Sequence, residues 1–163
     1  MFFGRNVNFY EVNELDALGF QGYYNLKTSL GNDEDVKIYS MIDSRKEKIY
    51  CAGYETSSEN KLKLVKNYEV TKLDNVIDEI IENKGNNKKV YLIGDAVFNY
   101  KAKILDKLGD FVRIFEDKNL AINTMTYVEM FLDESFKNDD VIGLKKTDIF
   151  NLKPDYLEKS QAE

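Results

Sequence analysis

The stretch from residue 36 to residue 55 constrains the fold more than any other part of the chain. Two runs of side chains, at 36–42 and 49–54, alternate between two faces, and a period of two is typical of a strand. The charged break at 44–47 has the length of a short hairpin loop, so the strands are expected to pair antiparallel. Beta-branched and aromatic residues dominate both runs, which suits a partly buried sheet. The sequence therefore predicts a central hairpin in a mixed sheet.

The segments after this hairpin follow the pattern of an α/β fold. Residues 62–70 alternate as a third strand, and residues 73–84 place apolar side chains along one helical face. The elements predicted next are a buried strand at 90–93, a helix over 97–108, a strand over 111–115 and a helix over 120–136. An antiparallel meander followed by helix-linked parallel strands predicts a ribonuclease-H-like mixed sheet flanked by helices, the fold of each half of the actin-like proteins.

Both ends of the chain lie outside this pattern. The apolar spacing predicts a helix over 12–29, capped by Asn13 or Asn8 and interrupted at its two glycines. The acidic run at 31–35 is expected to be a solvated turn rather than a metal site. The last residues have little periodicity and are expected to extend over a surface. The predicted organisation is a helical lead-in (1–35), an α/β domain (36–137) and an extended tail (138–163).

The composition limits the classes of protein to consider. The 163 residues suffice for one domain with a substantial core, and 43% hydrophobic with 32% charged residues is neither membrane-like nor disordered. A formal net charge of -6 argues against binding nucleic acid over a broad basic face. The sequence contains neither a secretion signal nor an apolar run of about 18 residues that would span a membrane. We expect a cytoplasmic α/β protein.

Two residue counts narrow the chemistry further. The single cysteine, Cys51, has no partner for an internal disulfide and is expected to behave as a small buried hydrophobe, which fits a reducing compartment. The chain contains no histidine. Histidine-based triads, HExxH metalloprotease sites and imidazole zinc sites are therefore excluded.

Short segments of the chain match motifs of one known family. Asp43, Arg45 and Tyr50 belong to the hairpin segment Met-Ile-Asp-Ser-Arg-Lys-Glu-Lys-Ile-Tyr, which is similar to a family motif written IDAR-(R/K)-x-E-V-Y. Gly94 and Asp95 follow an apolar strand, as in a family element written G-D-G. Both segments occur in the order that the family has. Together they resemble the TsaB (YeaZ) family, bacterial actin-like proteins used in making threonylcarbamoyl-adenosine in transfer RNA.

The C-terminal segment adds to this resemblance. Pro154, Tyr156 and Leu157 stand in a stretch similar to the family's L-x-P-x-Y-L-R-x-x-x-A-E, with Glu158 where the family has arginine. The segment 13–18 also resembles the family's S-L-E-A-L helix. The family's D-T-S strand and its glycine-rich turn do not occur in this sequence. The resemblance therefore covers roughly residues 9–163 and corresponds to the C-terminal half of a TsaB-like protein.

The resemblance implies a role in a protein assembly rather than in catalysis. TsaB proteins are regarded as non-catalytic scaffolds for a catalytic paralogue, TsaD, and act with an ATPase, TsaE. This chain is accordingly expected to be an interaction domain without a cofactor or a metal, with TsaD-like and TsaE-like partners. A homodimer built through the aromatic N-terminal segment is a further alternative.

Three carboxylates support a rival hypothesis. Asp43 ends the first strand of the predicted sheet, Asp95 follows the fourth and Asp117 follows the fifth. In ribonuclease-H-like nucleases, carboxylates at such strand ends hold two metal ions that activate water and stabilise the leaving oxygen. We favour the alternative that Asp43 pairs with Arg45 or Lys48 at the hairpin and that Asp95 caps the next helix, because aspartate is common in turns and caps.

Overall fold

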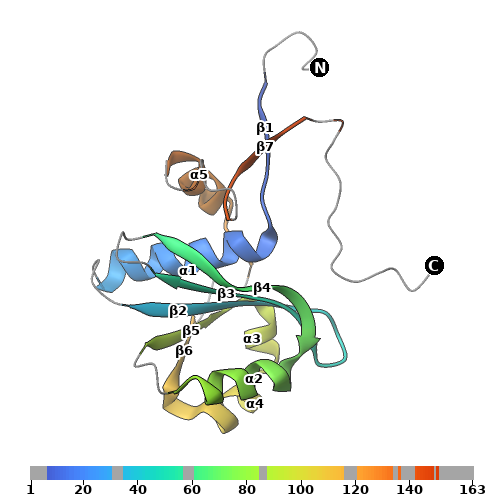
Figure 1. Cartoon of the computed structure of the whole chain (residues 1–163), viewed down its shortest axis with the longest axis vertical. Coiled ribbons are helices and arrows are strands. Elements are labelled where there is room, and N and C mark those ends of the chain that lie inside the picture. Colours follow the sequence, from blue (N-terminus) through green and yellow to red (C-terminus); the bar gives the residue numbers. More distant parts are fainter. Residues whose placement is uncertain are drawn as a thin grey trace, which may run out of the picture.

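A five-stranded sheet forms the centre of the computed structural model, which describes residues 7–30, 35–56, 61–84, 88–115, 121–133, 136, 142–148 and 150. The strands lie in the order β4-β3-β2-β5-β6 (Figure 1). Their bounds are β2 (Val36–Asp43), β3 (Lys48–Thr56), β4 (Leu62–Lys72), β5 (Lys89–Ile93) and β6 (Val112–Ile114). The pairs β2–β3 and β3–β4 are antiparallel, whereas β2–β5 and β5–β6 are parallel. The predicted mixed α/β sheet and its central hairpin are confirmed.

Helices cover both faces of this sheet. Figure 1 shows α1 (Glu14–Leu30) on one face and α2 (Leu73–Glu82), α3 (Asp95–Asn99) and α4 (Lys101–Leu108) on the other. The helix α5 (Thr124–Leu132) lies on the α1 side and contacts α1. Parallel neighbours require a crossover, and α2 supplies it before β5, while α3, α4 and the 3-10 turn Gly109–Phe111 supply it before β6.

The two faces of the sheet belong to two separate hydrophobic clusters. In β2, Ile38 faces the cluster that contains α1, whereas Tyr39 and Met41 face the cluster that contains α2 and α4. All three side chains are fully buried. The alternation in the sequence therefore arises because β2 is the central strand and must fill a core on each side.

The first helix is continuous, so the interruption expected at its glycines is wrong. Asn13 begins it, since its Oδ1 accepts a hydrogen bond of 2.9 Å from the N–H of Leu15. A Cβ on Gly19 would come within 2.8 Å of the Tyr54 ring, and a Cβ on Gly22 would meet the side chain of Phe115 at 3.3 Å. The glycines therefore allow α1 to approach the sheet closely, and this packing offsets their low helix propensity.

Two other predicted helices have different bounds in the structure. The segment expected as one helix over 97–108 begins at Asp95 and is divided into α3 and α4 at Tyr100, whose φ of -111° and ψ of 18° are not helical. The last helix, expected over 120–136, is shorter because α5 begins after its cap Asn123, whose side chain accepts from the N–H of Met125. A side-chain cap at Asn123 decides where α5 begins, whereas the non-helical backbone at Tyr100 separates α3 from α4.

The two ends of the described chain meet in a second, two-stranded sheet. β1 (Phe9–Glu11) pairs antiparallel with β7 (Lys145–Thr147), and Figure 1 shows this ribbon extending beyond α1. Only an extended tail without a partner strand was expected at 138–163. The predicted boundaries at 35 and 137 stay predictions, although α1 shares a hydrophobic cluster with β2 and β3. Within the described residues, none of the helices is both long and apolar enough to cross a membrane.

Candidate functional site

The structure brings two of the three predicted carboxylates together. Asp43 is the last residue of β2, and Asp95 is the first residue of α3, directly after β5 and its turn. Because β2 and β5 are neighbouring parallel strands, their carboxyl ends meet at one edge of the sheet. The backbone N–H of Asp43 donates a hydrogen bond of 2.9 Å to Oδ1 of Asp95. The third carboxylate, Asp117, lies outside the described residues.

The carboxylate of Asp43 is surrounded by hydrogen-bond donors. Its Oδ1 accepts from the backbone N–H of Arg45 at 2.8 Å and from the hydroxyl of Tyr100 at 3.1 Å, and its Oδ2 accepts from Nδ2 of Asn99 at 2.9 Å. Desolvation raises the pKa of this carboxyl, but the hydrogen bonds outweigh it and hold the pKa of Asp43 below its ordinary value. The side chain therefore joins the hairpin loop to the α3–α4 junction in its ionised form.

The predicted roles of Asp43 and Asp95 need one correction each. Asp43 does engage Arg45, as expected, but through the backbone N–H of the loop. Asp95 does not cap α3, because the N-cap position belongs to Gly94 and Asp95 instead accepts from β2. The position of an N-cap residue depends on where the backbone turns, and the turn falls one residue earlier than the sequence suggests.

Gly94 is required by the geometry of this site. Its φ of 116° and ψ of 173° belong to a region of backbone conformation that is essentially restricted to glycine. A Cβ at this position would overlap the carbonyl oxygen of Met41 in β2. The turn after β5 therefore passes directly against β2, and this contact places Asp95 beside Asp43.

The hairpin loop has an uncommon backbone. Arg45, Lys46 and Glu47 all have positive φ angles, of 67°, 52° and 58°, although none is glycine. The N–H of Lys48 donates to the carbonyl oxygen of Arg45 at 3.0 Å, so Lys46 and Glu47 occupy the two central positions of a tight turn. Asparagine and glycine are preferred at such positions, and their absence explains why the sequence predicted a short loop at 44–47 but not its left-handed backbone.

The arrangement at this edge matches a structural role for the two carboxylates. Donors from the loop, from α3 and from Tyr100 occupy the oxygens of Asp43, and Asp95 accepts from β2. Among the described residues, no group of three or more cysteine, aspartate or glutamate side chains is placed to hold a metal ion. The geometry of the described part is that of a junction between β2, β3, β5 and α3.

The remaining predicted site residues have separate positions. Tyr50 is half-buried in β3 and packs against the cluster on the α1 side. Cys51 is fully buried in the opposite cluster, as expected, and burial raises the pKa of its thiol to about 12. The thiol is therefore protonated at neutral pH and is not a nucleophile. The predicted motif residues Pro154, Tyr156 and Leu157, with Glu158 beside them, lie outside the described residues.

Sequence reasoning missed two polar networks that cross the layers of the fold. On the α1 side, the buried Asp16 accepts hydrogen bonds from the hydroxyls of Tyr54 at 2.8 Å and Tyr68 at 2.9 Å. On the other side, Glu79 of α2 accepts from the hydroxyl of Tyr39 at 2.9 Å and pairs with Lys66 of β4 at 2.6 Å. Helical and strand periodicity contains no signal for such pairs, because each partner sits on a different element.

Comparisons with known proteins leave the chain without a family assignment. No family model matches the sequence, and no curated protein matches it.

Proposed function

We propose that this chain is a non-catalytic interaction domain with a ribonuclease-H-like fold, equivalent to the C-terminal half of a TsaB-like subunit in threonylcarbamoylation of transfer RNA. The strand order supports the fold. Three antiparallel strands, followed by two parallel strands linked through helices and added on the other side of β2, make up the mixed sheet that such a fold requires.

One observation carries the functional part of the proposal. The two motif segments within the described residues, 41–50 and 90–96, are 40 positions or more apart in sequence and contact each other directly. Gly94 fits against Met41, and Asp95 accepts from the N–H of Asp43. The residue types in both motifs are thus accounted for by the junction between β2 and β5, without a catalytic role.

The chemistry of the described side chains supports a scaffold in the same way. Cys51 has a raised pKa and no histidine to act as its base, since the chain contains none. The oxygens of Asp43 are already engaged with three donors from the protein itself. These properties favour a domain in which neither side chain has a catalytic role.

The test is co-elution of the purified chain with the TsaD homologue of the same organism on size exclusion. We expect a complex, with this chain alone or with a version extended upstream of Met1. If only the extended version binds, the interface lies in the additional half. If neither version binds, the scaffold hypothesis loses its support.

The adjacency of Asp43 and Asp95 favours one second candidate, a metal-dependent nuclease that also uses Asp117. A scaffold should keep its melting temperature when Mg²⁺ or Mn²⁺ is added, whereas a metal site present only in the folded chain should raise it. The matched control is Asp43→Asn, which removes the charge at the junction. A metal-dependent increase that this variant abolishes would support the nuclease and contradict the scaffold.

A further inference from the structure

We propose that the end of the β2–β3 hairpin binds an acidic segment of a partner protein through four cations, Arg45, Lys46, Lys48 and Lys72. These residues are called the basic tip below. All four side chains are exposed. The proposal rests on the proposed function, since it names the chemistry of the partner that an interaction domain would bind here.

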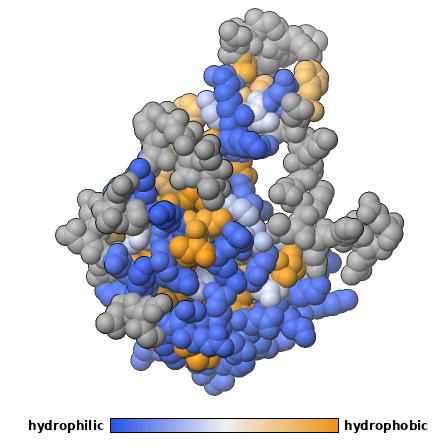
Figure 2. All heavy atoms as spheres, viewed as in Figure 1, coloured by the Kyte–Doolittle hydropathy of each residue, from blue (hydrophilic) through white to orange (hydrophobic). Residues whose placement is uncertain are grey.

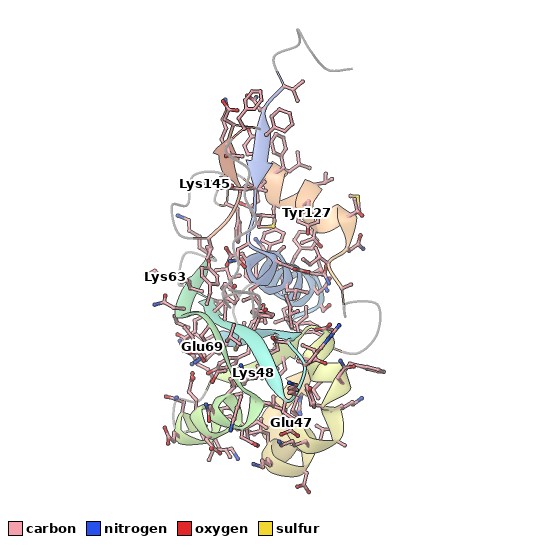
Figure 3. The ribbon with its side chains drawn as sticks, turned by 90° about the vertical axis from the view of Figure 1, so that its right-hand side faces the viewer. Glu47, Lys48, Lys63, Glu69, Tyr127 and Lys145 are labelled. Atoms are coloured by element: carbon pink, nitrogen blue, oxygen red, sulfur yellow. The ribbon has the colours of Figure 1, made fainter. Side chains whose placement is uncertain are left out.

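The basic tip is assembled from two parts of the chain. Lys48 of β3 and Lys72 of β4 stand directly opposite each other in the antiparallel register. The N–H of Leu73 donates to the carbonyl oxygen of Glu47 at 3.0 Å, which joins the start of α2 to the hairpin loop. Figure 3 shows Glu47 and Lys48 at this end of the molecule, toward α2 and α4, and Lys63 near the other end of β4.

Two carboxylates near the basic tip, Glu47 and Asp74, are engaged with lysines outside it. Glu47 pairs with Lys103 at 3.3 Å, and Asp74 pairs with Lys103 at 3.0 Å and with Lys107 at 2.9 Å. Within the described part of the chain, Arg45, Lys46 and Lys72 form no ion pair. The basic tip is therefore a local positive surface on a chain whose net charge is -6. Figure 2 shows a mainly hydrophilic surface, with small apolar patches, over the part of the molecule that contains α2 and α4.

The backbone of the basic tip opposes folding. Three consecutive left-handed residues without a glycine cost free energy, on the order of 1 kcal/mol or more each. Such strain occurs preferentially where a segment is held ready for a ligand.

The loop is also held in place before any partner arrives. Asp43 accepts from the N–H of Arg45, and Leu73 donates to Glu47, so the loop backbone is attached both to β2 and to α2. A loop that is already ordered loses little conformational entropy when it binds. The backbone that carries the two exposed cations, Arg45 and Lys46, is consequently held in one conformation.

The size and surroundings of the basic tip favour a protein over a nucleic acid. Binding to a phosphate backbone depends on neutralising many phosphates, which needs a long row of cations. The basic tip supplies four cations, which is too few for such a row. The planar guanidinium of Arg45 suits a two-point hydrogen bond with a single carboxylate. We therefore infer a short acidic segment with a few glutamate or aspartate side chains.

The test uses the full chain labelled with ¹⁵N and a short peptide of alternating glutamate and alanine. We expect the amide shifts to change most at residues 44–48 and 72–73, with weaker binding at high salt. The double variant Arg45→Glu/Lys46→Glu should weaken binding by about tenfold or more. The matched control is Lys63→Glu, an equal charge change per site at the far end of β4, and it should change binding by less than about twofold.

Each result of these experiments supports or contradicts the proposed binding of an acidic segment. Shifts spread evenly over all lysines, or equal weakening by Lys63→Glu, would overturn the proposal. Tighter binding of a uridine oligonucleotide of the same charge would replace the acidic segment with nucleic acid. If the TsaD homologue co-elutes with the parent chain and equally with the double variant, the proposed function stands and the basic tip is not its interface. If the homologue binds neither but the peptide binds the tip, only the proposed function fails.

Discussion

Asp43 is the residue whose role changes most between the sequence and the structure. As a carboxylate at the end of a strand, it resembles a metal ligand. In the structure it accepts hydrogen bonds from a loop N–H, an amide and a phenol, contributed by Arg45, Asn99 and Tyr100. A carboxylate with three donors is stabilised in its charged form, which explains its lowered pKa.

The stability of the fold should depend on the charge of Asp43. Because its pKa is lower in the folded chain, this group contributes stability above the unfolded value of about 3.9, and the contribution is lost as pH falls through the folded value. We expect Asp43→Asn to lower the free energy of unfolding by about 1–2 kcal/mol at pH 7. The difference between parent and variant should shrink below about pH 4. Urea unfolding over a pH series measures this difference in the free energy of unfolding. The control is Asp106→Asn, at an exposed position of α4. A difference that stays constant with pH would contradict the assignment.

Ser40 represents the opposite case, a polar group that the fold leaves unsatisfied. Its side chain is fully buried in β2, and its Oγ has no hydrogen-bond partner among the described residues. Ser40→Ala should therefore raise the free energy of unfolding by about 1 kcal/mol, because the desolvation cost of the hydroxyl disappears.

The comparison for Ser40 is Thr126, which is also buried but is hydrogen-bonded to Oε1 of Gln21 at 2.7 Å. Thr126→Val should lower the free energy of unfolding by about 1–2 kcal/mol, since it removes a donor from a buried amide oxygen. Thermal unfolding of both variants provides the measurement. Equal destabilisation by the two changes would mean that Ser40 has a partner in solution.

At the scale of elements, the contact between β2 and the turn after β5 positions the candidate site. The parallel pairing of these strands extends from Val36 opposite Lys89 to Ser40 opposite Ile93. The chain then turns at Gly94 against Met41 and begins α3. Two elements that are far apart in sequence thus share one polar junction.

Gly94→Ala should disrupt this junction strongly. The new Cβ would overlap the carbonyl oxygen of Met41, and the backbone conformation is unfavourable for alanine, so we expect a loss of about 3 kcal/mol or more in stability. Gly109→Ala is the matched control, because that glycine also has a positive φ but no atom lies within 4 Å of the added Cβ. It should cost about 1–2 kcal/mol. Chemical denaturation of both variants separates the cost of the steric overlap from the cost of the backbone conformation. Similar losses of stability in the two variants would contradict the close approach of Gly94 to Met41.

At the scale of the whole molecule, α1 completes the core. Leu15, Leu18, Phe20 and Tyr23 are all less than 10% exposed and belong to the cluster that includes Ile38. Burying four side chains of this size contributes about 6–12 kcal/mol, which is comparable to the total stability of an ordinary domain. The α/β sheet therefore depends on the helix that precedes it.

A chain that starts at residue 36 should fail to unfold cooperatively, because one face of its sheet would be exposed. A chain that starts at residue 12 loses β1 but keeps Asn13 and all of α1, and it should melt within a few degrees of the parent. Circular dichroism with thermal unfolding compares the three chains. Cooperative melting of the shorter chain at the parent temperature would show that the lead-in predicted at 1–35 is dispensable.

Periodicity along the sequence predicted the elements whose pattern arises from burial. The strands β2, β3, β4 and β5 and the helix α2 lie close to their predicted positions, because each fills one or two fixed faces of the core. The same pattern placed Asp43 and Asp95 at strand ends, and the parallel pairing of β2 with β5 brought these ends together. The sheet and the location of the site were therefore accessible from the sequence.

Only the tertiary structure decided which groups form hydrogen bonds with each other at this edge of the sheet. Asp43 contacts side chains 52 to 57 positions away, namely Asp95, Asn99 and Tyr100, and β1 pairs with β7 across almost the entire chain. Nothing local encodes such contacts, since they depend on how whole elements pack. The alternation of buried and exposed residues determined which elements form, whereas packing between distant elements determined that two carboxylates serve as hydrogen-bond acceptors in a structural junction.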